Sequence, residues 1–531
     1  MKTVVIILFC LVFLAPSVRA GWTGAVADQN ISQFTDDSLM ATSGRIVYNP
    51  CYDNLLAIWR QDITSNTAEL AFSISTDFGV TWSGTSGDSF LSADDGQSDA
   101  YVRFRVLSID IDSQGKVYVV WAETYIDSIE IMISISSDGG HTWTGTASDK
   151  PISCLVGENN RAYKPAIAVD NNDNIHVVWS EKPAGAVFSE IMYAKSVDGG
   201  ISWSCVDNNK VISFPDFSTA LNADIAIAPN NDIYVVWEEK NDPSDPYSKR
   251  IFYGKSTDGG QTFNSETADL PIGETIRSSG EAYIRIDLSG NVHVVWSATR
   301  AISPPLFSDV YYTGSTDGGA TWSGVDNAIL VDFGPGDSAG VFYPALAVTT
   351  DGKLACVWNE GPDQNNNVGP GVICASYSTD GGATWSGNNE PEVISFPGDH
   401  PSYRPHIFCG IGDTLHVVWD EVITSDGGSD IHYSKGDTLA TGGGGGCDYT
   451  AGDVNGSSNY NGLDITYGVS YFKGGADPLC PDCPVGDCNT WHYCGDVNGS
   501  CGYNGLDITY GVAYFKGGPG PIPCEDCPPA E

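Results

Sequence analysis

Seven tryptophans recur along this chain at nearly constant spacing, and each one ends a short apolar run. The runs read LLAIW, VYVVW, IHVVW, IYVVW, VHVVW, LACVW and LHVVW, and they end at Trp59, Trp121, Trp179, Trp237, Trp296, Trp358 and Trp419. Successive tryptophans are 62, 58, 58, 59, 62 and 61 residues apart. Short β-branched runs that are apolar on both faces are typical of strands buried on both sides. The spacing therefore predicts one structural unit repeated seven times.

Each unit contains the signals of four strands. An apolar run such as PAIAVD precedes the tryptophan strand, a run such as IMYAKS follows it, and another short apolar stretch such as NAILVDF ends the unit. Four strands repeated radially predict an all-β fold, a seven-bladed β-propeller, with six blades as the runner-up. The seventh unit lacks a fourth strand, so we expect a strand around residues 31–34 to complete it and close the ring, which removes an exposed sheet edge.

A polar octet also recurs, with the pattern Ser-x-Asp-x-Gly-x-Thr-Trp. The copies begin at Ser75, Ser136, Ser196, Ser256, Ser315 and Ser378. Asp and Ser side chains can cap nearby backbone amides, glycine can take the positive φ of a tight turn, and the aromatic residue can pack under the sheet. Six equivalent carboxylates around a ring cannot converge on one substrate, so the octet is interpreted as a structural turn.

This octet resembles the Asp-box, or bacterial neuraminidase repeat, of sialidase-like β-propellers, and the resemblance covers roughly residues 21–438. In that family the octet joins the third and fourth strands of a blade. It would then lie at the same end as the short turns between strands one and two, and the long, dissimilar loops would gather at the opposite end. We expect function at this opposite end, where a rigid scaffold presents variable loops.

Two residue sets point to the variable end. Glutamates stand two places after five of the repeated tryptophans, at Glu123, Glu181, Glu239, Glu360 and Glu421. Arginines stand at or just before the first strand of several units, at Arg45, Arg103, Arg105, Arg161 and Arg404. Together they could grip a carboxylated sugar while an acid protonates the leaving oxygen. Alternatively, the recurring glutamates satisfy the same local contact in every unit.

The resemblance to sialidases implies three arginines on the substrate carboxylate, a tyrosine nucleophile paired with a glutamate, and an aspartate acid/base. Arg45 in GRIVYNP takes the place of the family's Arg-Ile-Pro opening but lacks the proline. Arg404 in SYRP is a second candidate, and Arg161 or Arg103 a third. The nucleophile could be Tyr343 or Tyr403, and Glu360 is the candidate carboxylate.

The ends of the chain carry other signals. Residues 1–20 combine Lys2, an apolar run and a small-residue site at Ala20, which predicts a secretory signal peptide and an exported protein. No later apolar run has the roughly 20 residues that cross a bilayer. The formal net charge of −42 gives no basic footprint for nucleic acid.

After the propeller (residues 21–440) and a glycine linker (441–446), residues 447–531 change in composition. Eight cysteines fall in this segment, which favours disulfides, although the pairs Cys480/Cys483 and Cys524/Cys527 could hold zinc. A 24-residue segment beginning at Gly452 recurs at Gly495, with oxygen-bearing residues at the spacing of an EF-hand-type calcium loop. The expected ligands are Asp453, Asn455, Ser457, Asn461 and Asp464, then Asp496, Asn498, Ser500, Asn504 and Asp507.

In the first copy, Ile465, Val469 and Phe472 would share one face of the helix that follows the loop. The paired loop-helix repeats resemble a type I dockerin. The resemblance implies a small α-helical domain that binds two Ca²⁺ ions and docks on a cohesin-like domain of a scaffold protein.

The sequence therefore predicts an exported, sialidase-like propeller that binds or hydrolyses glycans as an exo-glycosidase does and joins a larger assembly through its dockerin-like domain. The alternative is a non-catalytic structural or adhesive propeller at the cell surface.

Overall fold

The computed structural model divides the chain into two compact units, Gly21–Thr438 and the remaining residues. It describes Trp22 and residues 29–32, 39–64, 67–86, 89–93, 107–125, 128–146, 150–153, 161–182, 187–204, 210–216, 218–240, 249–268, 270–273, 277–299, 308–323, 328–332, 339–362, 371–388, 391–395, 400–423 and 428–436, with seven further positions between 465 and 516. Only the first unit is described in enough detail to follow its fold.

Within these residues the first unit is built almost entirely from antiparallel meanders of consecutive strands. The first three meanders contain β2 (Ala41–Asn49), β3 (Asn54–Asp62), β4 (Ala68–Ser75) and β5 (Ser89–Phe90); β6 (Leu107–Ile111), β7 (Val117–Tyr125), β8 (Ser128–Ser136) and β9 (Lys150–Pro151); and β10 (Arg161–Val169), β11 (Ile175–Lys182), β12 (Glu190–Ser196) and β13 (Lys210–Val211). The fourth contains β14 (Ala220–Ile227), β15 (Ile233–Lys240) and β16 (Lys249–Ser256), and Phe252 of β16 forms a bridge with Pro271.

The later meanders follow the same plan. They contain β17 (Arg277–Ile286), β18 (Val292–Thr299), β19 (Ser308–Ser315) and β20 (Ile329–Leu330); β21 (Ala339–Val348), β22 (Leu354–Pro362), β23 (Val372–Ser378) and β24 (Glu392–Val393); and β25 (Ser402–Cys409), β26 (Leu415–Val422), β27 (Ser429–Gly436) and β1 (Gln29–Asn30). Four short 3₁₀ helices, η1 (Ser83–Ser86), η2 (Asn264–Glu266), η3 (Ser386–Asn388) and η4 (Ile411–Asp413), are the only helical elements assigned in the described part of this unit.

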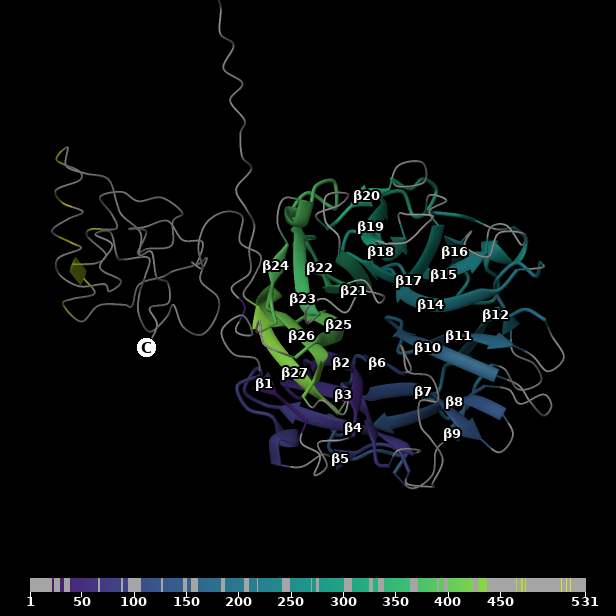
Figure 1. Ribbon diagram of the computed structural model, residues 1–531, viewed down its shortest axis with the longest axis horizontal. Coiled ribbons are helices and arrows are strands. Elements are labelled where there is room, and N and C mark those ends of the chain that lie inside the picture. Colours follow the sequence, from purple (N-terminus) through teal and green to yellow (C-terminus); the bar gives the residue numbers. More distant parts are fainter. Residues whose placement is uncertain are drawn as a thin grey trace, which may run out of the picture. The chain divides into compact units, whose positions relative to one another are not determined.

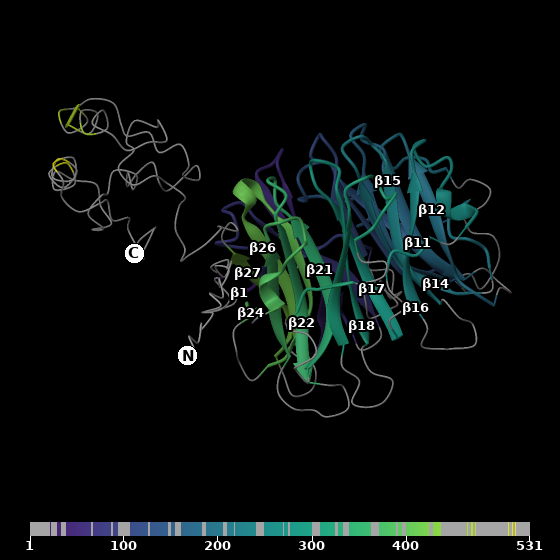
Figure 2. The ribbon, with the colours of Figure 1, turned by 90° about the horizontal axis from the view of Figure 1, so that it is seen from above.

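The meanders form a closed ring, which is the architecture of a β-propeller. The first strand of each meander contacts the first strand of the next, and β25 contacts β2 to complete the circle. Figure 1 shows these first strands nearest the centre of the ring, and Figure 2 shows the sheets side by side around it. The all-β propeller expectation is confirmed.

The N-terminal segment completes the last meander, as the sequence predicts, but its strand is Gln29–Asn30 and precedes the expected residues 31–34. Strand β1 pairs antiparallel with β27, and the amide of Ile31 donates to the carbonyl of Ile431. Trp22 lies further along β27, where it forms a bridge with Gly436 and donates its indole N–H to the hydroxyl of Tyr377, 2.6 Å away. The first and last described segments of this unit thus share one sheet.

The core lies between neighbouring sheets. All seven repeated tryptophans are fully buried. Five of them are packed by aliphatic residues of their own meander and an adjacent one, namely Trp59, Trp121, Trp179, Trp237 and Trp296. Because each side chain is large and completely enclosed, replacing one by alanine should cost about 3–5 kcal/mol. The tryptophan repeat in the sequence is therefore a packing repeat.

The octets are turns held by their own side chains. In one copy the Ser256 hydroxyl donates to Asp258 (2.8 Å) and accepts from the amide of Gly260 (2.9 Å), and Thr262 donates to the same carboxylate through its amide (2.9 Å) and hydroxyl (2.6 Å). These hydrogen bonds from Thr262 and Ser256 lower the pKa of Asp258. Gly260 has a φ of +88°, which glycine adopts without strain.

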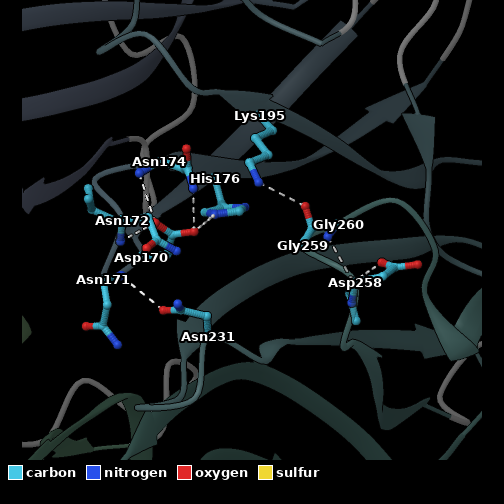
Figure 3. A network of polar contacts seen from close by, with 12 residues as sticks. Asp170, Asn171, Asn172, Asn174, His176, Lys195, Asn231, Asp258, Gly259 and Gly260 are labelled. Carbon is cyan, nitrogen blue, oxygen red and sulfur yellow. Dashed lines mark hydrogen bonds and ion pairs between the residues drawn. The ribbon is translucent and has the colours of Figure 1, made fainter.

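The octet end of the ring also joins neighbouring meanders. Figure 3 shows Lys195 donating to the carbonyl of Gly259 in the next octet (3.1 Å), and the amide of Asn171 donating to Asn231 of the next meander (3.1 Å). Asp170, His176 and Tyr193 form a buried chain beside them, in which the His176 ring lies 2.7 Å from the tyrosine hydroxyl. Every polar group named here has a partner within the protein, so these contacts are structural.

Several expectations lie outside the described residues. They include the signal peptide, the glycine linker, both calcium loops and the eight cysteines after residue 440. In the second unit, Ile465, Val469, Ile508 and Val512 have helical backbone. Cys51, Cys356, Cys374 and Cys409 of the described part form no disulfide. Among the helices that the structure describes, none has the length and apolar character of a membrane span.

Candidate functional site

The end of the ring opposite the octets is shaped by bulges in the innermost strands. Six of these strands, β2, β10, β14, β17, β21 and β25, slip in register against the second strand of their meander near the same point. One residue at each slip has a positive φ. These bulge residues are Ser43, Lys164, Asn222, Glu281, Tyr343 and Arg404, with φ between 50° and 63°. Such backbone costs of order 1–3 kcal/mol per non-glycine residue and is typical of functional sites.

In three meanders the residue directly after the repeated tryptophan braces a bulge of the following meander. The carboxylate of Asp420 accepts from the amide of Ser43 (2.8 Å), and the Ser180 hydroxyl accepts from the amide of Asn222 (3.0 Å). The amide side chain of Asn359 donates to the carbonyl of Ser402 (2.7 Å). The bulges are therefore rigid positions, and we call the end of the ring where they lie the mouth.

Two arginines and two tyrosines meet at one side of the mouth. Ser43, Arg45, Tyr283, Tyr343, Arg404 and Pro405 line a small cavity of about 10 Å³, which is room for about one water molecule. These residues come from four different meanders. The Ser43 hydroxyl is buried here without a hydrogen-bond partner in the described part of the chain.

The two arginines of this cavity are held differently. Arg404 forms a close ion pair with the buried carboxylate of Asp420 through its Nε. Burial acts to lower the pKa of Arg404, but the charge of Asp420 raises it overall, so the guanidinium stays charged. Arg45 is 7% exposed, and it donates to the carbonyls of Gly44 (2.8 Å) and Ser43 (3.4 Å). No carboxylate among the described residues forms an ion pair with Arg45.

A second polar group lies on the third, fourth and fifth meanders. Its centre is Glu238, the residue after Trp237, whose Oε1 accepts from the Asn222 amide (2.6 Å) and from Lys249 (3.2 Å). Burial raises the pKa of Glu238, the charges of Lys249 and Lys164 oppose this, and Glu281 adds to the rise. Glu281 also influences the pKa of Arg404, so the two polar groups are electrostatically connected.

A channel of about 300 Å³ runs between the innermost strands, and Arg45, Lys164 and Asn222 are among its lining residues. Further along it lie Asp110 and Asp224, which accept hydrogen bonds from amides of the neighbouring meanders, Val169 (2.7 Å) and Ile284 (3.0 Å). Burial raises the pKa of Asp110 to about 6. These carboxylates join adjacent inner strands. In the described part of the chain no group of three or more His, Cys, Asp or Glu residues could hold a metal ion.

The structure brings together some of the candidate residues from the sequence. Arg45, Tyr343 and Arg404 line the same cavity. Tyr403 is half-buried one residue before Arg404 and pairs in register with Asp420. Arg161 is exposed at the start of β10 and is not among the residues lining either cavity.

Glu360 has a contact of a different kind. Its Oε2 accepts from the Trp358 indole (3.1 Å), and Glu123, Glu181, Glu239 and Glu421 accept in the same way from their own tryptophans, at 2.8–3.2 Å. The repeated glutamate thus makes the same local contact in each of these meanders, which is the structural alternative considered for it.

Sequence reasoning missed the bulge residues Lys164, Asn222 and Glu281 and the bracing residues Glu238 and Asp420. A signal for them existed in the repeats. The position after the tryptophan is Arg, Ala, Ser, Glu, Ser, Asn and Asp in turn, whereas the next position is mostly Glu. Variation at one fixed position of a repeat marks the surface on which units differ, and here that surface is the mouth.

Comparison with known proteins supports the fold. No protein-family model matches the sequence. No curated protein matches it. Among solved structures, an ulvan lyase of the polysaccharide lyase family PL25 is similar, with 13% identity and a TM-score of 0.52 over 77% of this chain and 95% of that chain. The same kind of enzyme bound to -[GlcA(1-4)Rha3S]- matches with 12% identity and a TM-score of 0.50 over the same shares.

A sialidase, NanB from Streptococcus pneumoniae, matches with 14% identity and a TM-score of 0.40, covering 77% of this chain and 70% of that chain. The likeness in fold therefore rests on the two ulvan lyase structures.

Proposed function

We propose that this protein is an exported propeller that binds or hydrolyses glycans carrying a carboxylate, with the sugar held at the mouth. The observation that carries the proposal is the meeting of Arg45, Tyr343 and Arg404 in one cavity, although they are up to 359 positions apart in the sequence. Two arginine side chains and one tyrosine side chain reach this cavity because they lie at or beside bulges on separate strands.

Electrostatics favour an anionic ligand. A buried guanidinium without a carboxylate partner is unfavourable, because burial removes its hydration. Arg45 is such a group within the described residues, so a sugar carboxylate would supply the missing charge through bidentate hydrogen bonds. Arg404, fixed by Asp420, would contribute a second cation with a defined orientation.

The solved structures are consistent with this proposal. The ulvan lyase that shares the fold was crystallised with a saccharide that contains glucuronic acid, GlcA. For hydrolysis of the sialidase type, Tyr343 is the nucleophile we favour over Tyr403, because Tyr343 lines the cavity with both arginines. Each of the seven meanders would be one blade.

The remaining parts of the proposal rest on the sequence. Residues 1–20 would direct export, and residues 447–531 would bind two Ca²⁺ ions and dock on a cohesin-like domain. This arrangement would hold a glycan-active propeller within a larger secreted assembly.

The proposal is tested by binding and turnover with a panel of sialosides, glucuronides and neutral glycosides carrying a fluorogenic leaving group. We expect affinity for the acidic members alone, and a loss of at least tenfold in Arg45→Ala, since one charged hydrogen bond is worth roughly 1.5–3 kcal/mol. Turnover abolished by Tyr343→Phe would identify a hydrolase, and binding without turnover a lectin-like protein. Equal affinity for neutral and acidic glycosides would contradict the proposal.

A further inference from the structure

The polar groups at the mouth lie on two sides of it. Ser43, Arg45, Tyr343 and Arg404 come from the first, sixth and seventh meanders, whereas Lys164, Asn222 and Glu281 come from the third, fourth and fifth. Because the innermost strands follow one another around the ring, the strands that carry the two sets lie on different sides of it. Arg45, Lys164 and Asn222 line the same channel of about 300 Å³, a volume within the range of small-ligand pockets.

The side formed by Asn222 has a fixed chemical character. A carboxylate can only accept, so the contact with Glu238 requires the Asn222 Nδ2 to donate. The Asn222 backbone amide is held by Ser180. The Oδ1 of Asn222 accepts no hydrogen bond from the described residues, and Asn222 lines the channel. The side chain therefore offers a hydrogen-bond acceptor with a defined orientation.

The buried carboxylate of Glu238 explains why this orientation is stable. Its side chain is only 4% exposed, and Asn222 and Lys249 together occupy Oε1. A buried carboxylate is retained only when hydrogen bonds and opposite charges compensate it. Lys164 lies close enough for its charge to influence Glu238. This side of the channel thus presents an amide acceptor and an ammonium donor, with the charges of Glu238 and Glu281 near them.

We infer that Lys164 and Asn222 form a second sugar subsite, which takes a neutral unit adjoining the acidic unit held at Arg45 and Arg404. The ammonium donates to one hydroxyl and the amide oxygen accepts from a neighbouring one. A second carboxylate is disfavoured here, because Glu238 and Glu281 already place negative charge beside the subsite. The ligand is then an oligosaccharide that spans the mouth. This inference rests on the proposed function and deepens it.

The test compares glucuronic acid with a disaccharide in which glucuronic acid is linked to a neutral sugar, by titration calorimetry on the full chain. We expect the wild type to bind the disaccharide about tenfold more tightly than the monosaccharide. Lys164→Met, which leaves the Asn222 to Glu238 contact in place, and Asn222→Gly, which tolerates a positive φ, should each remove most of this preference. Neither should change the affinity for glucuronic acid.

Matched controls lie at the octet end. Asn231→Gly alters an asparagine of positive φ in the same meander, and Lys353→Met removes a lysine from the turn between β21 and β22. Both controls should keep the wild-type preference. Monosaccharide binding without a preference for the disaccharide would overturn the second subsite alone. Failure of both sugars to bind would overturn the subsite, and the panel of sialosides and glucuronides then decides whether the proposed function fails with it.

Discussion

Neighbouring residues at the exit of each second strand have different tasks. The residue two places after a repeated tryptophan accepts from the indole in most meanders, as Glu239 does. The residue one place after the tryptophan braces the bulge of the next meander in three of them, as Ser180 does. The first task is the same in nearly every meander, so the sequence repeats. The bulges shape the mouth, and the residue directly after the tryptophan varies from one meander to the next. A glutamate that recurs in register is therefore a poor candidate for catalysis in this fold.

Removing one of the repeated glutamates should affect stability without affecting binding. Glu181→Ala leaves the buried Trp179 indole without its acceptor, which lies 2.8 Å away. The free energy of unfolding should fall by about 1–3 kcal/mol in urea denaturation, the usual cost of an unsatisfied buried polar group. Affinity for acidic glycans should not change. A tenfold loss of affinity would instead place this glutamate at the site.

Buried histidines make stability depend on pH. Burial lowers the pKa of His176 to about 4 and that of His416 to about 3, against about 6.5 in an unfolded chain. Below pH 6.5 the unfolded state therefore binds protons at these histidines that the folded state does not bind. The contribution of neutral His176 to the free energy of unfolding is fully present above pH 6.5. It is lost as the pH drops toward 4, and the total loss is about 3 kcal/mol.

The measurement is urea denaturation of the wild type and of His176→Asn between pH 7 and pH 4. The wild type should lose stability more steeply with falling pH than the variant, by up to about 1.4 kcal/mol per pH unit. Parallel profiles would show that His176 is not held neutral in the folded protein.

At the scale of elements, the last meander replaces an octet with a segment from the other end of the chain. In the first meander, Ser75, the first residue of the octet, pairs with Leu55. In the last meander the equivalent partner of Leu415 is Gly436. Trp22 packs on this glycine and reaches Tyr377 of the preceding meander. The tryptophan of the first octet, Trp82, spans two meanders in a similar way by packing on Tyr433.

Trp22→Ala should therefore weaken the closure of the ring. The side chain is 5% exposed, so its loss should lower the free energy of unfolding by about 3–5 kcal/mol and lower Tm. Trp22→Phe, which keeps the ring but not the indole N–H, should lose roughly 1–3 kcal/mol. Differential scanning calorimetry distinguishes the two losses. An unchanged Tm in both variants would mean that Trp22 does not close the ring.

The sequence contains enough information for the elements but not for the whole mouth. Strands and octet turns follow from local patterns, because β-branched runs and Asp, Ser and Gly signals act over a few residues. The bulges do not, because Lys164 and Glu281 take a positive φ only when neighbouring strands impose it. Arg45 and Arg404 could be named from the sequence, but their meeting depends on ring closure between residues far apart in the chain.

For the whole molecule, the two units should respond separately to calcium. The ten expected calcium ligands all fall in residues 447–531, and no metal-binding cluster exists in the described part of the propeller. Chelation should lower the Tm of a transition belonging to the C-terminal segment and leave the propeller transition in place, because a ligand stabilises only the unit that binds it. Scanning calorimetry with and without chelator tests this, and a shift confined to the propeller would refute it.

The central claim is that the mouth, and not the octet end, is the working surface of the propeller. A crystal structure of the protein with a disaccharide of glucuronic acid and a neutral sugar tests it most directly. We expect the carboxylate within hydrogen-bond distance of Arg45 and Arg404, with the neutral unit against Lys164 and Asn222. A saccharide bound among the octets, with the mouth empty, would contradict it.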